Sequence, residues 1–203
     1  MNFLAVDTSG KYMSVIAYAQ GKAYQRFLPD CALKHSVLLM QEIDAALKLA
    51  NITPKDCDFF AAVSGPGSFT GIRIGLSTVK GMCVALEKPA LSVTAFDTLA
   101  YAEGSTPLLT LVDAGHDCFY ACGYDQEKNV AFESAFLSHG EVDRLIASGF
   151  TPVAAAPLFE GCRVANPCEG MLAAVLKKQT ELVNPSALSA LYLRKSSAEE
   201  NRV

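Results

Sequence analysis

The sequence predicts an α/β protein made of two similar halves, each a mixed β-sheet flanked by helices. Three observations lead to this fold class. Apolar strand patterns alternate with helical patterns along the 203 residues. A run of three strands, with an aspartate directly after the first strand, occurs at Asp7 and again at Asp113. A continuous apolar run at residues 59–63 leads into a glycine-rich turn and then into a helix.

Composition and charge are those of a globular protein and exclude several classes of function. Of all residues, 51% are hydrophobic and 19% are charged, and the formal net charge is −4. This balance gives no electrostatic basis for direct binding to nucleic acid or to an anionic membrane. Charges or glycines interrupt every long apolar run, so we expect no membrane-spanning helix. The start of the chain lacks the basic residues of a signal peptide, and we therefore expect a cytoplasmic protein.

The seven cysteines are scattered along the chain and predict free thiols. No two of them have the Cys-x-x-Cys spacing. The nearest pairs, Cys118 with Cys122 and Cys162 with Cys168, suit neither a zinc ribbon nor a redox motif. We expect buried, reduced cysteines in a reducing compartment.

The first half opens with a predicted meander of three strands, followed by a helix. These elements span residues 3–6, 12–19, 22–28 and 35–50. Leu39 and Ile43 mark the core side of the helix, while Leu38 and Met40 help to make its first turns apolar almost all round. A helix this apolar is either sandwiched between other elements or faces a partner.

The glycine-rich turn after residues 59–63 organises the rest of this half. Gly65 and Gly67 permit a tight turn, because glycine reaches positive φ without strain. Ser68 or Thr70 is placed to cap the following helix. The helix itself is predicted from an apolar stripe made of Ile72, Leu76, Val79, Cys83 and Leu86.

Two interpretations of this turn and helix stay open. Free N–H groups at a helix start can bind phosphate, but the turn lacks the Lys-Ser/Thr of a P-loop and the dinucleotide glycine pattern. A purely structural turn is therefore an equal alternative. On the helix, Gly71, Gly75 and Thr78, with Gly81 further on, form a smooth strip. Such a strip either receives a partner helix or makes a tight internal contact, since each helical glycine costs about 1 kcal/mol.

The second half repeats the arrangement of the first. A polar break at residues 104–107 follows the helix capped by Thr94, and there we place the boundary between a domain of residues 1–104 and a smaller one of residues 105–203. The first half ends with a predicted strand at residues 89–93 and a predicted helix at residues 95–103. In the second half the predicted strands are residues 108–112, 118–124, 130–137 and 152–156, and the predicted helices are residues 140–148 and 170–179.

The aspartate turns are candidate nucleotide sites. In the first, Asp7 can hold a metal-bound water, and Thr8 and Ser9 can meet a phosphate. The alternative is an ordinary hairpin turn, for which Asp, Ser and Gly are common residues. Asp113 occupies the matching place in the second half.

Two such halves resemble the actin-like superfamily (the ASKHA, ribonuclease H-like fold), in which two aspartate turns face each other across a nucleotide cleft. Within it, four blocks resemble the TsaB (YeaZ) family, the accessory subunit for making threonylcarbamoyladenosine (t6A) at position 37 of tRNAs that read ANN codons. The blocks are FLAVDTS at residues 3–9, SGPGSFTGIRIG at 64–75, VDA at 112–114 and YLR at 192–194. The resemblance implies at most a vestigial nucleotide site at Asp7, Thr8, Ser9 and Asp113.

One departure from the family concerns the second aspartate turn. The family usually continues Asp-Ala-Arg, whereas this chain reads Asp113, Ala114, Gly115 and then His116. The role of that arginine is therefore in doubt here. His116 either stands in for it in part or is an exposed turn residue without a task.

The resemblance also implies that this chain is not itself an enzyme. The catalytic paralogue, TsaD, holds a metal with two histidines four residues apart on a helix. His35, His116 and His139 cannot make such a pair, and a late Gly-Gly turn for adenosine is missing. We therefore expect no catalytic residues, no metal and no cofactor of its own. Whether ATP or ADP binds at the interface of a complex stays open.

Its function would then depend on its surface. The resemblance implies a heterodimer with TsaD, recruitment of the ATPase TsaE, a homodimer in the absence of TsaD, and contact with tRNA only through the complex. We expect the two helices of the first half to make the interface. The predicted interface residues are Leu38, Met40, Phe69, Thr70, Gly71, Arg73, Ile74, Gly75 and Thr78.

Two rival functions belong to other classes. One is a small ATPase or kinase that uses Asp7, Thr8, Ser9 and Asp113, which a titration with ATP would detect. The other is a standalone homodimeric scaffold without any role in tRNA modification.

Overall fold

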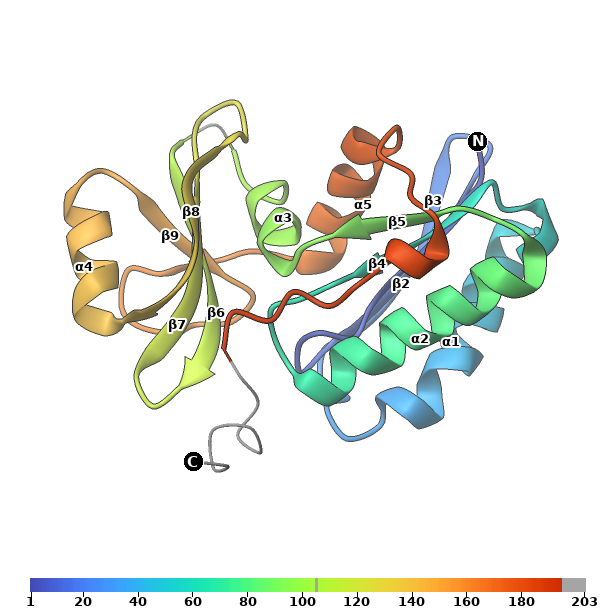
Figure 1. Cartoon of the computed structure of the whole chain (residues 1–203), viewed down its shortest axis with the longest axis horizontal. Helices are drawn as coiled ribbons and strands as arrows, with labels where there is room; N and C mark the ends of the chain where they lie inside the picture. The colour runs from blue at the N-terminus through green and yellow to red at the C-terminus, as the bar shows by residue number, and fades with distance from the viewer. Residues whose placement is uncertain (105, 195–203) are drawn as a thin grey trace.

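The computed structural model describes residues 1–104 and 106–194, and these form two five-stranded mixed sheets. Figure 1 shows the sheets side by side along the long axis of the molecule, each with helices against it. Ser105, in the predicted break between the halves, lies outside the described residues, as does the end of the chain. The predicted α/β class with two mixed sheets is confirmed.

The first sheet has the strand order β3-β2-β1-β4-β5. β1 pairs antiparallel with β2 and parallel with β4, so the meander and the later strands meet on β1. All five residues of β1 and of β4 are buried, which explains their continuous apolar sequences. The strands are β1 (Phe3–Asp7), β2 (Met13–Ala19), β3 (Lys22–Leu28), β4 (Phe59–Val63) and β5 (Ala90–Val93).

The second sheet repeats this topology. Its order is β10-β9-β6-β7-β8, with β6 in the place of β1: antiparallel to β7 and parallel to β9. The predicted duplication of a three-strand meander is therefore confirmed, and it extends to the whole sheet. The strands are β6 (Leu108–Gly115), β7 (Cys118–Tyr124), β8 (Val130–Ser138), β9 (Thr151–Ala154) and β10 (Arg163–Val164).

Helices of the first half cover one face of the first sheet. α1 (His35–Ala50) and α2 (Phe69–Leu86) bury the predicted stripes, including Leu39, Ile43 and Ile72, against Leu4 and Val6 of β1. Asn51 and Glu87 end the two helices in the left-handed conformation. The short 3-10 helix η1 (Pro54–Asp56) connects α1 to β4.

The other face of each sheet is covered by a helix from the opposite half. α3 (Ala95–Ala100), which follows β5, packs on the second sheet through Phe96 and Leu99. α5 (Pro167–Lys178), which follows β10, packs on the first sheet, where Met171 and Val175 share a buried core with Phe59. The core between each sheet and the helix that the opposite half supplies therefore contains residues from both halves of the chain.

α3 and α5 also pack closely on each other. A Cβ added at Gly170 would lie 1.7 Å from the carbonyl oxygen of Thr98, so only glycine permits this approach. After α5 the chain returns along the first half through η2 (Pro185–Ala187), and Val183 forms a single bridge with Ala90 of β5. Residues on both sides of residue 104 share these two cores, and the domain division placed there stays a prediction.

The second half lacks a counterpart of α2. In the first half, β4 and β5 are joined through an 18-residue helix, whereas β9 and β10 are joined only by residues 155–162. α4 (His139–Ala147) covers the outer face of the second sheet, with Val142 buried against Leu109 and Phe119. The described residues between β9 and β10 therefore hold no crossover helix.

Most predicted elements lie where the sequence places them. Helix α3 ends at Ala100 rather than at residue 103, and β6 continues to Gly115. The two-residue strand β10 was not predicted. All seven cysteines are free, and five of them are buried.

α2 differs from the expectation that no helix of this chain is long and apolar enough to span a membrane. With 18 residues and a mean hydropathy of 1.2, it is long and apolar enough, by length and composition alone, to cross a membrane. A core helix of a globular protein passes the same test, and α2 packs on the first sheet through its buried stripe. A single helix of this kind is weak support for a membrane span.

Candidate functional site: aspartate turns and partner surface

The aspartate of the first turn is enclosed by its own chain. Asp7 is fully buried, and its Oδ1 accepts hydrogen bonds from the Ser9 amide at 2.8 Å and the Ser9 hydroxyl at 2.7 Å. Its Oδ2 accepts a hydrogen bond from the Tyr12 hydroxyl at 3.0 Å. Burial raises the pKa of the Asp7 carboxyl, and the bonds from Ser9 and Tyr12 act in the opposite direction. The carboxylate holds the turn together.

The rest of this turn is bound to the glycine-rich turn and α2. The Thr8 hydroxyl donates to the carbonyl of Gly71 at 2.7 Å, and the Ser68 amide donates to the carbonyl of Ser9 at 2.8 Å. A Cβ on Gly67 would lie 2.3 Å from the Ser9 carbonyl oxygen. The side chains of Asp7, Thr8 and Ser9 are thus all buried and engaged internally. This supports the structural interpretation of the glycine-rich turn over a phosphate cradle.

Two glycines of α2 are likewise explained by close contact with the first aspartate turn. A Cβ on Gly71 would lie 2.0 Å from the carbonyl oxygen of Thr8, and one on Gly75 would lie 2.6 Å from the Thr8 hydroxyl. Both are buried, so the predicted smooth strip is not exposed at these two positions and its internal interpretation holds there. Gly81, by contrast, is exposed and has open space around it. Ser68, not Thr70, caps α2 by accepting the Gly71 amide.

The second aspartate turn is open to solvent. Asp113 is exposed and accepts one hydrogen bond, from the Gly115 amide at 2.8 Å. His116 is exposed with φ at 54°. The next residue, Asp117, receives a hydrogen bond from His139 at 2.8 Å, and this contact raises the pKa of the imidazole. His139 therefore lies beside the turn that carries His116, a proximity that the sequence does not reveal.

The two aspartate turns lie on the same side of the molecule, the lower side in Figure 1. Within the described residues, no hydrogen bond or ion pair joins them. Only the second turn presents an exposed carboxylate. The predicted set of Asp7, Thr8, Ser9 and Asp113 is therefore divided between a closed turn and an open one.

A buried polar network joins the two halves. Asp97 of α3 accepts hydrogen bonds from Lys178 of α5 at 2.8 Å and from the Tyr124 hydroxyl of β7 at 3.1 Å. Its carboxylate also completes the capping box of α3, because it accepts the Thr94 amide while the Thr94 hydroxyl accepts the Asp97 amide. Burial and the Asp97 charge raise the pKa of Tyr124. The side chain of Asp97 is only 5% exposed and that of Lys178 is 24% exposed, so the carboxylate is largely removed from water and the lysine is partly so.

The predicted partner residues have unequal exposure. Met40, Thr70 and Arg73 are exposed, and Gly71 and Gly75 are buried. The remaining predicted residues are half-buried: Leu38, Phe69, Ile74 and Thr78. α1 also exposes apolar side chains on its outer side, where Met40 is 57% exposed. Among the described residues nothing covers this side, so α1 is not sandwiched.

The C-terminal segment contributes residues to the same surface. The ring of Tyr192 stacks on Phe69 with 4.6 Å between centroids and 13° between planes. The Nε of Arg73 donates to the Tyr192 hydroxyl at 3.0 Å. The predicted interface includes Phe69 and Arg73 but not Tyr192, because 119 residues separate Arg73 from this partner.

Comparison with known proteins places the chain in a family. A model of the family described as "TsaD: tRNA N6-adenosine threonylcarbamoyltransferase" matches residues 12–165, well over half of the chain. The chain belongs to the TsaD family, on its TsaB (YeaZ) branch. The resemblance stated from the four sequence blocks is confirmed.

Relatives on the TsaB branch are moderately similar. The "tRNA threonylcarbamoyladenosine biosynthesis protein TsaB" of Escherichia coli K12 is 29% identical over 133 residues, which are 64% of this chain and 57% of that protein. The Bacillus subtilis TsaB is 29% identical over 100 residues, 49% of this chain and 44% of the relative. The chain thus spans only about half the length of these curated relatives. The solved structure of YeaZ from Pseudomonas aeruginosa is 25% identical, with a TM-score of 0.76 over 94% of this chain and all of that one.

Proposed function

We propose that this TsaB-branch protein is a non-catalytic subunit required for threonylcarbamoyl transfer to adenosine 37 of tRNAs that read ANN codons. It acts by forming a heterodimer with a TsaD-type catalytic subunit and by helping to recruit a TsaE-type ATPase. The observation that carries the proposal is the similarity to proteins named for threonylcarbamoyladenosine biosynthesis.

The arrangement of candidate catalytic groups supports a non-catalytic role. His35 is buried in the first half with its Nε2 2.9 Å from the Tyr12 carbonyl oxygen, while His116 and His139 lie in the second half. Within the described residues no three His, Cys, Asp or Glu side chains cluster as metal ligands do. Since Asp7, Thr8 and Ser9 are engaged internally, the rival ATPase has little support in the first turn. A nucleotide, if the complex uses one, would bind at the interface between subunits.

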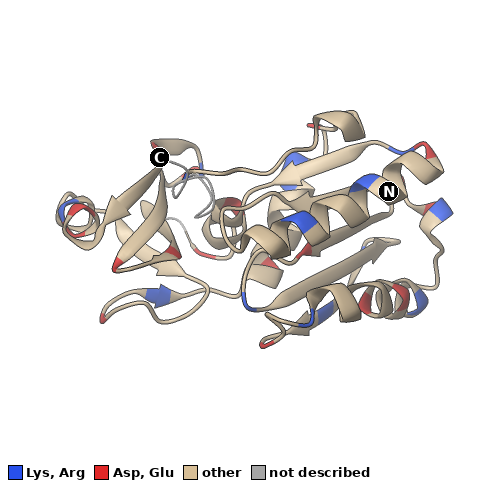
Figure 2. Cartoon of the chain, turned by 60° about the horizontal axis from the view of Figure 1, so that its bottom comes forward, with Lys and Arg blue, Asp and Glu red and all other residues tan. Residues whose placement is uncertain are grey.

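The exposed apolar residues on α1 support binding to a protein partner, and the negative net charge of the chain argues against direct binding to nucleic acid. Met40 and the half-buried Leu38 of α1, with the half-buried Ile74 of α2, offer apolar side chains to a partner, and the same residues would form a homodimer when the partner is absent. Acidic and basic residues are interspersed over the described ribbon (Figure 2). With a net charge of −4, tRNA would be reached only through the complex, in the cytoplasm and without a membrane.

A reconstituted reaction tests the proposal. It would contain the adenylate-forming enzyme, the TsaD-type and TsaE-type proteins, tRNA, ATP, threonine and bicarbonate, with or without this chain. We expect t6A only when this chain is present, and none when it replaces the TsaD-type protein. Equal product without this chain would contradict the proposal and favour the scaffold, while hydrolysis of ATP by the chain alone would favour the ATPase.

A pair of matched variants tests the interface. Gly75 is one of the predicted interface residues, but Gly75→Arg would not test the interface. A side chain at this position would collide with Thr8 inside the protein and disturb the fold. Met40 and Leu49 of α1 are 57% and 56% exposed, and nine residues place them on opposite sides of the helix, about two and a half turns apart. We expect Met40→Glu to abolish the heterodimer and Leu49→Glu to leave it intact, as measured by size-exclusion chromatography. Equal affinities would contradict the interface.

A further inference from the structure

Arg73 is held in a fixed orientation by two aromatic rings from distant parts of the chain. Its guanidinium carbon lies 5.8 Å from the ring centroid of Phe69 and 5.8 Å from that of Tyr192. Its Nε donates to the Tyr192 hydroxyl at 3.0 Å. Because the two rings are stacked on each other, they form one rigid support for the guanidinium.

The segment that carries Tyr192 is itself anchored on both sides. Leu188 is buried in the core of the first half, and the Leu191 amide donates to the Ser64 carbonyl at 2.8 Å. Leu193 packs against the second half, where the guanidinium of Arg194 lies 5.3 Å from the ring centroid of Phe136. In Figure 1 this dark red segment runs from η2 past the start of α2 to the second half. Tyr192 is therefore held in place by its neighbours.

Arg73 keeps unused hydrogen-bond donors on an exposed surface. A guanidinium has five N–H donors, and the bond to Tyr192 uses the one on Nε. Among residues 1–104 and 106–194 it has no carboxylate partner. Arg73 is exposed and Tyr192 is 42% exposed, so a binding partner can reach both. An arginine oriented before binding loses little side-chain entropy when it forms a pair.

We propose that the cluster of Phe69, Arg73 and Tyr192 is a carboxylate-binding anchor in the partner surface, completed by the C-terminal segment. It pairs the two free nitrogens of Arg73 with an Asp or Glu side chain of the TsaD-type subunit. The identity of the partner rests on the proposed function. A single fixed arginine beside aromatic rings suits one planar carboxylate, whereas nucleic acid requires several cations along a backbone. Arginine and tyrosine are also the residue types that dominate binding energy at protein interfaces.

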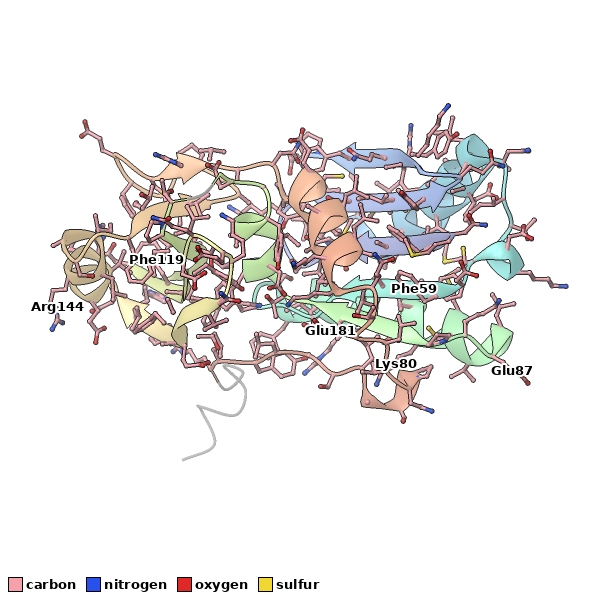
Figure 3. All side chains as sticks on the ribbon, turned by 90° about the horizontal axis from the view of Figure 1, so that it is seen from above. Phe59, Lys80, Glu87, Phe119, Arg144 and Glu181 are labelled. Atoms are coloured by element: carbon pink, nitrogen blue, oxygen red, sulfur yellow. The ribbon has the colours of Figure 1, made fainter. Side chains whose placement is uncertain are left out.

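The test measures affinity of the full chain for the TsaD-type subunit from the same genome by isothermal titration calorimetry. We expect Arg73→Gln to weaken binding about thirtyfold and Arg73→Lys about tenfold, since lysine lacks the planar fork. Tyr192→Phe keeps the ring and removes the hydroxyl that orients Arg73, and about fivefold weaker binding is expected. Arg144→Gln is the matched control, because Arg144 is exposed on α4 at the far end of the molecule (Figure 3) and its Nε also donates one hydrogen bond.

The outcomes separate this inference from the proposed function. Unchanged melting temperatures would show that each variant is folded. If the unmodified chain binds but Arg73→Lys and Tyr192→Phe bind equally well, the anchor is wrong and the heterodimer stands. If the unmodified chain does not bind, both proposals fail. If the variants change only the self-association of this chain, the anchor binds a second copy of the chain, and its assignment to the TsaD-type subunit is wrong.

Discussion

The turn between β1 and β2 and the turn between β6 and β7 occupy the same place in two sheets of the same topology, but their surroundings are opposite. Asp7 is fully buried and accepts three hydrogen bonds from Ser9 and Tyr12. Asp113 is exposed and accepts one from Gly115. The difference arises from the segment after the fourth strand of each half: α2 closes over the first turn, and residues 155–162 provide no such helix. A duplicated sheet therefore does not by itself duplicate a site.

The largest effect is expected where the two halves are joined. Asp97→Ala leaves the ammonium of Lys178 and the hydroxyl of Tyr124 without their buried partner, and it removes the carboxylate half of the capping box of α3. We expect a loss of about 3–5 kcal/mol in the free energy of unfolding, measured by urea denaturation. A loss below about 1 kcal/mol would contradict the structural role of the network.

The next test compares the two aspartates directly. Asp7→Ala leaves the Ser9 amide and hydroxyl and the Tyr12 hydroxyl buried without an acceptor, and it should cost about 3 kcal/mol. Asp113→Ala removes one exposed hydrogen bond and should cost no more than about 0.5 kcal/mol. Equal costs in chemical denaturation would show that the two turns are alike in solution.

A smaller effect is expected from α2 itself. Gly71→Ala places a Cβ against the Thr8 carbonyl and should destabilise the protein by about 2 kcal/mol. Gly81→Ala, in the same helix and with open space around it, should stabilise by about 0.5–1 kcal/mol. Thermal denaturation of both variants is the measurement. Stabilisation by both substitutions would show that α2 does not close over the first turn.

The smallest effect concerns the second turn. The hydrogen bond to Asp117, together with the Asp117 and Asp143 charges, raises the pKa of His139 above 6.5. A raised imidazole pKa adds stability that is fully present below pH 6.5 and is lost as the pH rises through the folded pKa. Titration of the His139 resonances by NMR should show the raised value, and Asp117→Asn should lower it. An unchanged titration in Asp117→Asn would contradict the contact.

Local sequence patterns predict most of the fold. The apolar runs of β1 and β4, the stripe of α2 and the duplicated meander depend on periodicity, which is visible within short windows. Helix starts are predicted less sharply, because Ser68 and Thr70 are both good caps and only the fold selects Ser68.

The features that determine the candidate site are not local. A glycine has the same sequence signature whether it faces a partner or its own chain, and only the fold shows that Gly71 and Gly75 face Thr8. The exchange of α3 and α5 between the sheets depends on packing across the whole chain. Tyr192 contacts Phe69 only after the C-terminal segment has returned to the first half.

Because α5 covers the first sheet and α3 covers the second, the exchange of helices also affects the order in which the two halves can fold during synthesis on the ribosome. The strands of the first sheet are made early, but the helix that covers their inner face comprises residues 167–178, near the end of the described chain. Until α5 emerges, the rings of Phe3 and Phe59 have no helix above them. The amino-terminal half therefore cannot finish folding as an independent unit during synthesis, although multidomain proteins commonly fold from that end. A ribosome that stalls before α5 would display an unfinished sheet, a substrate for chaperones.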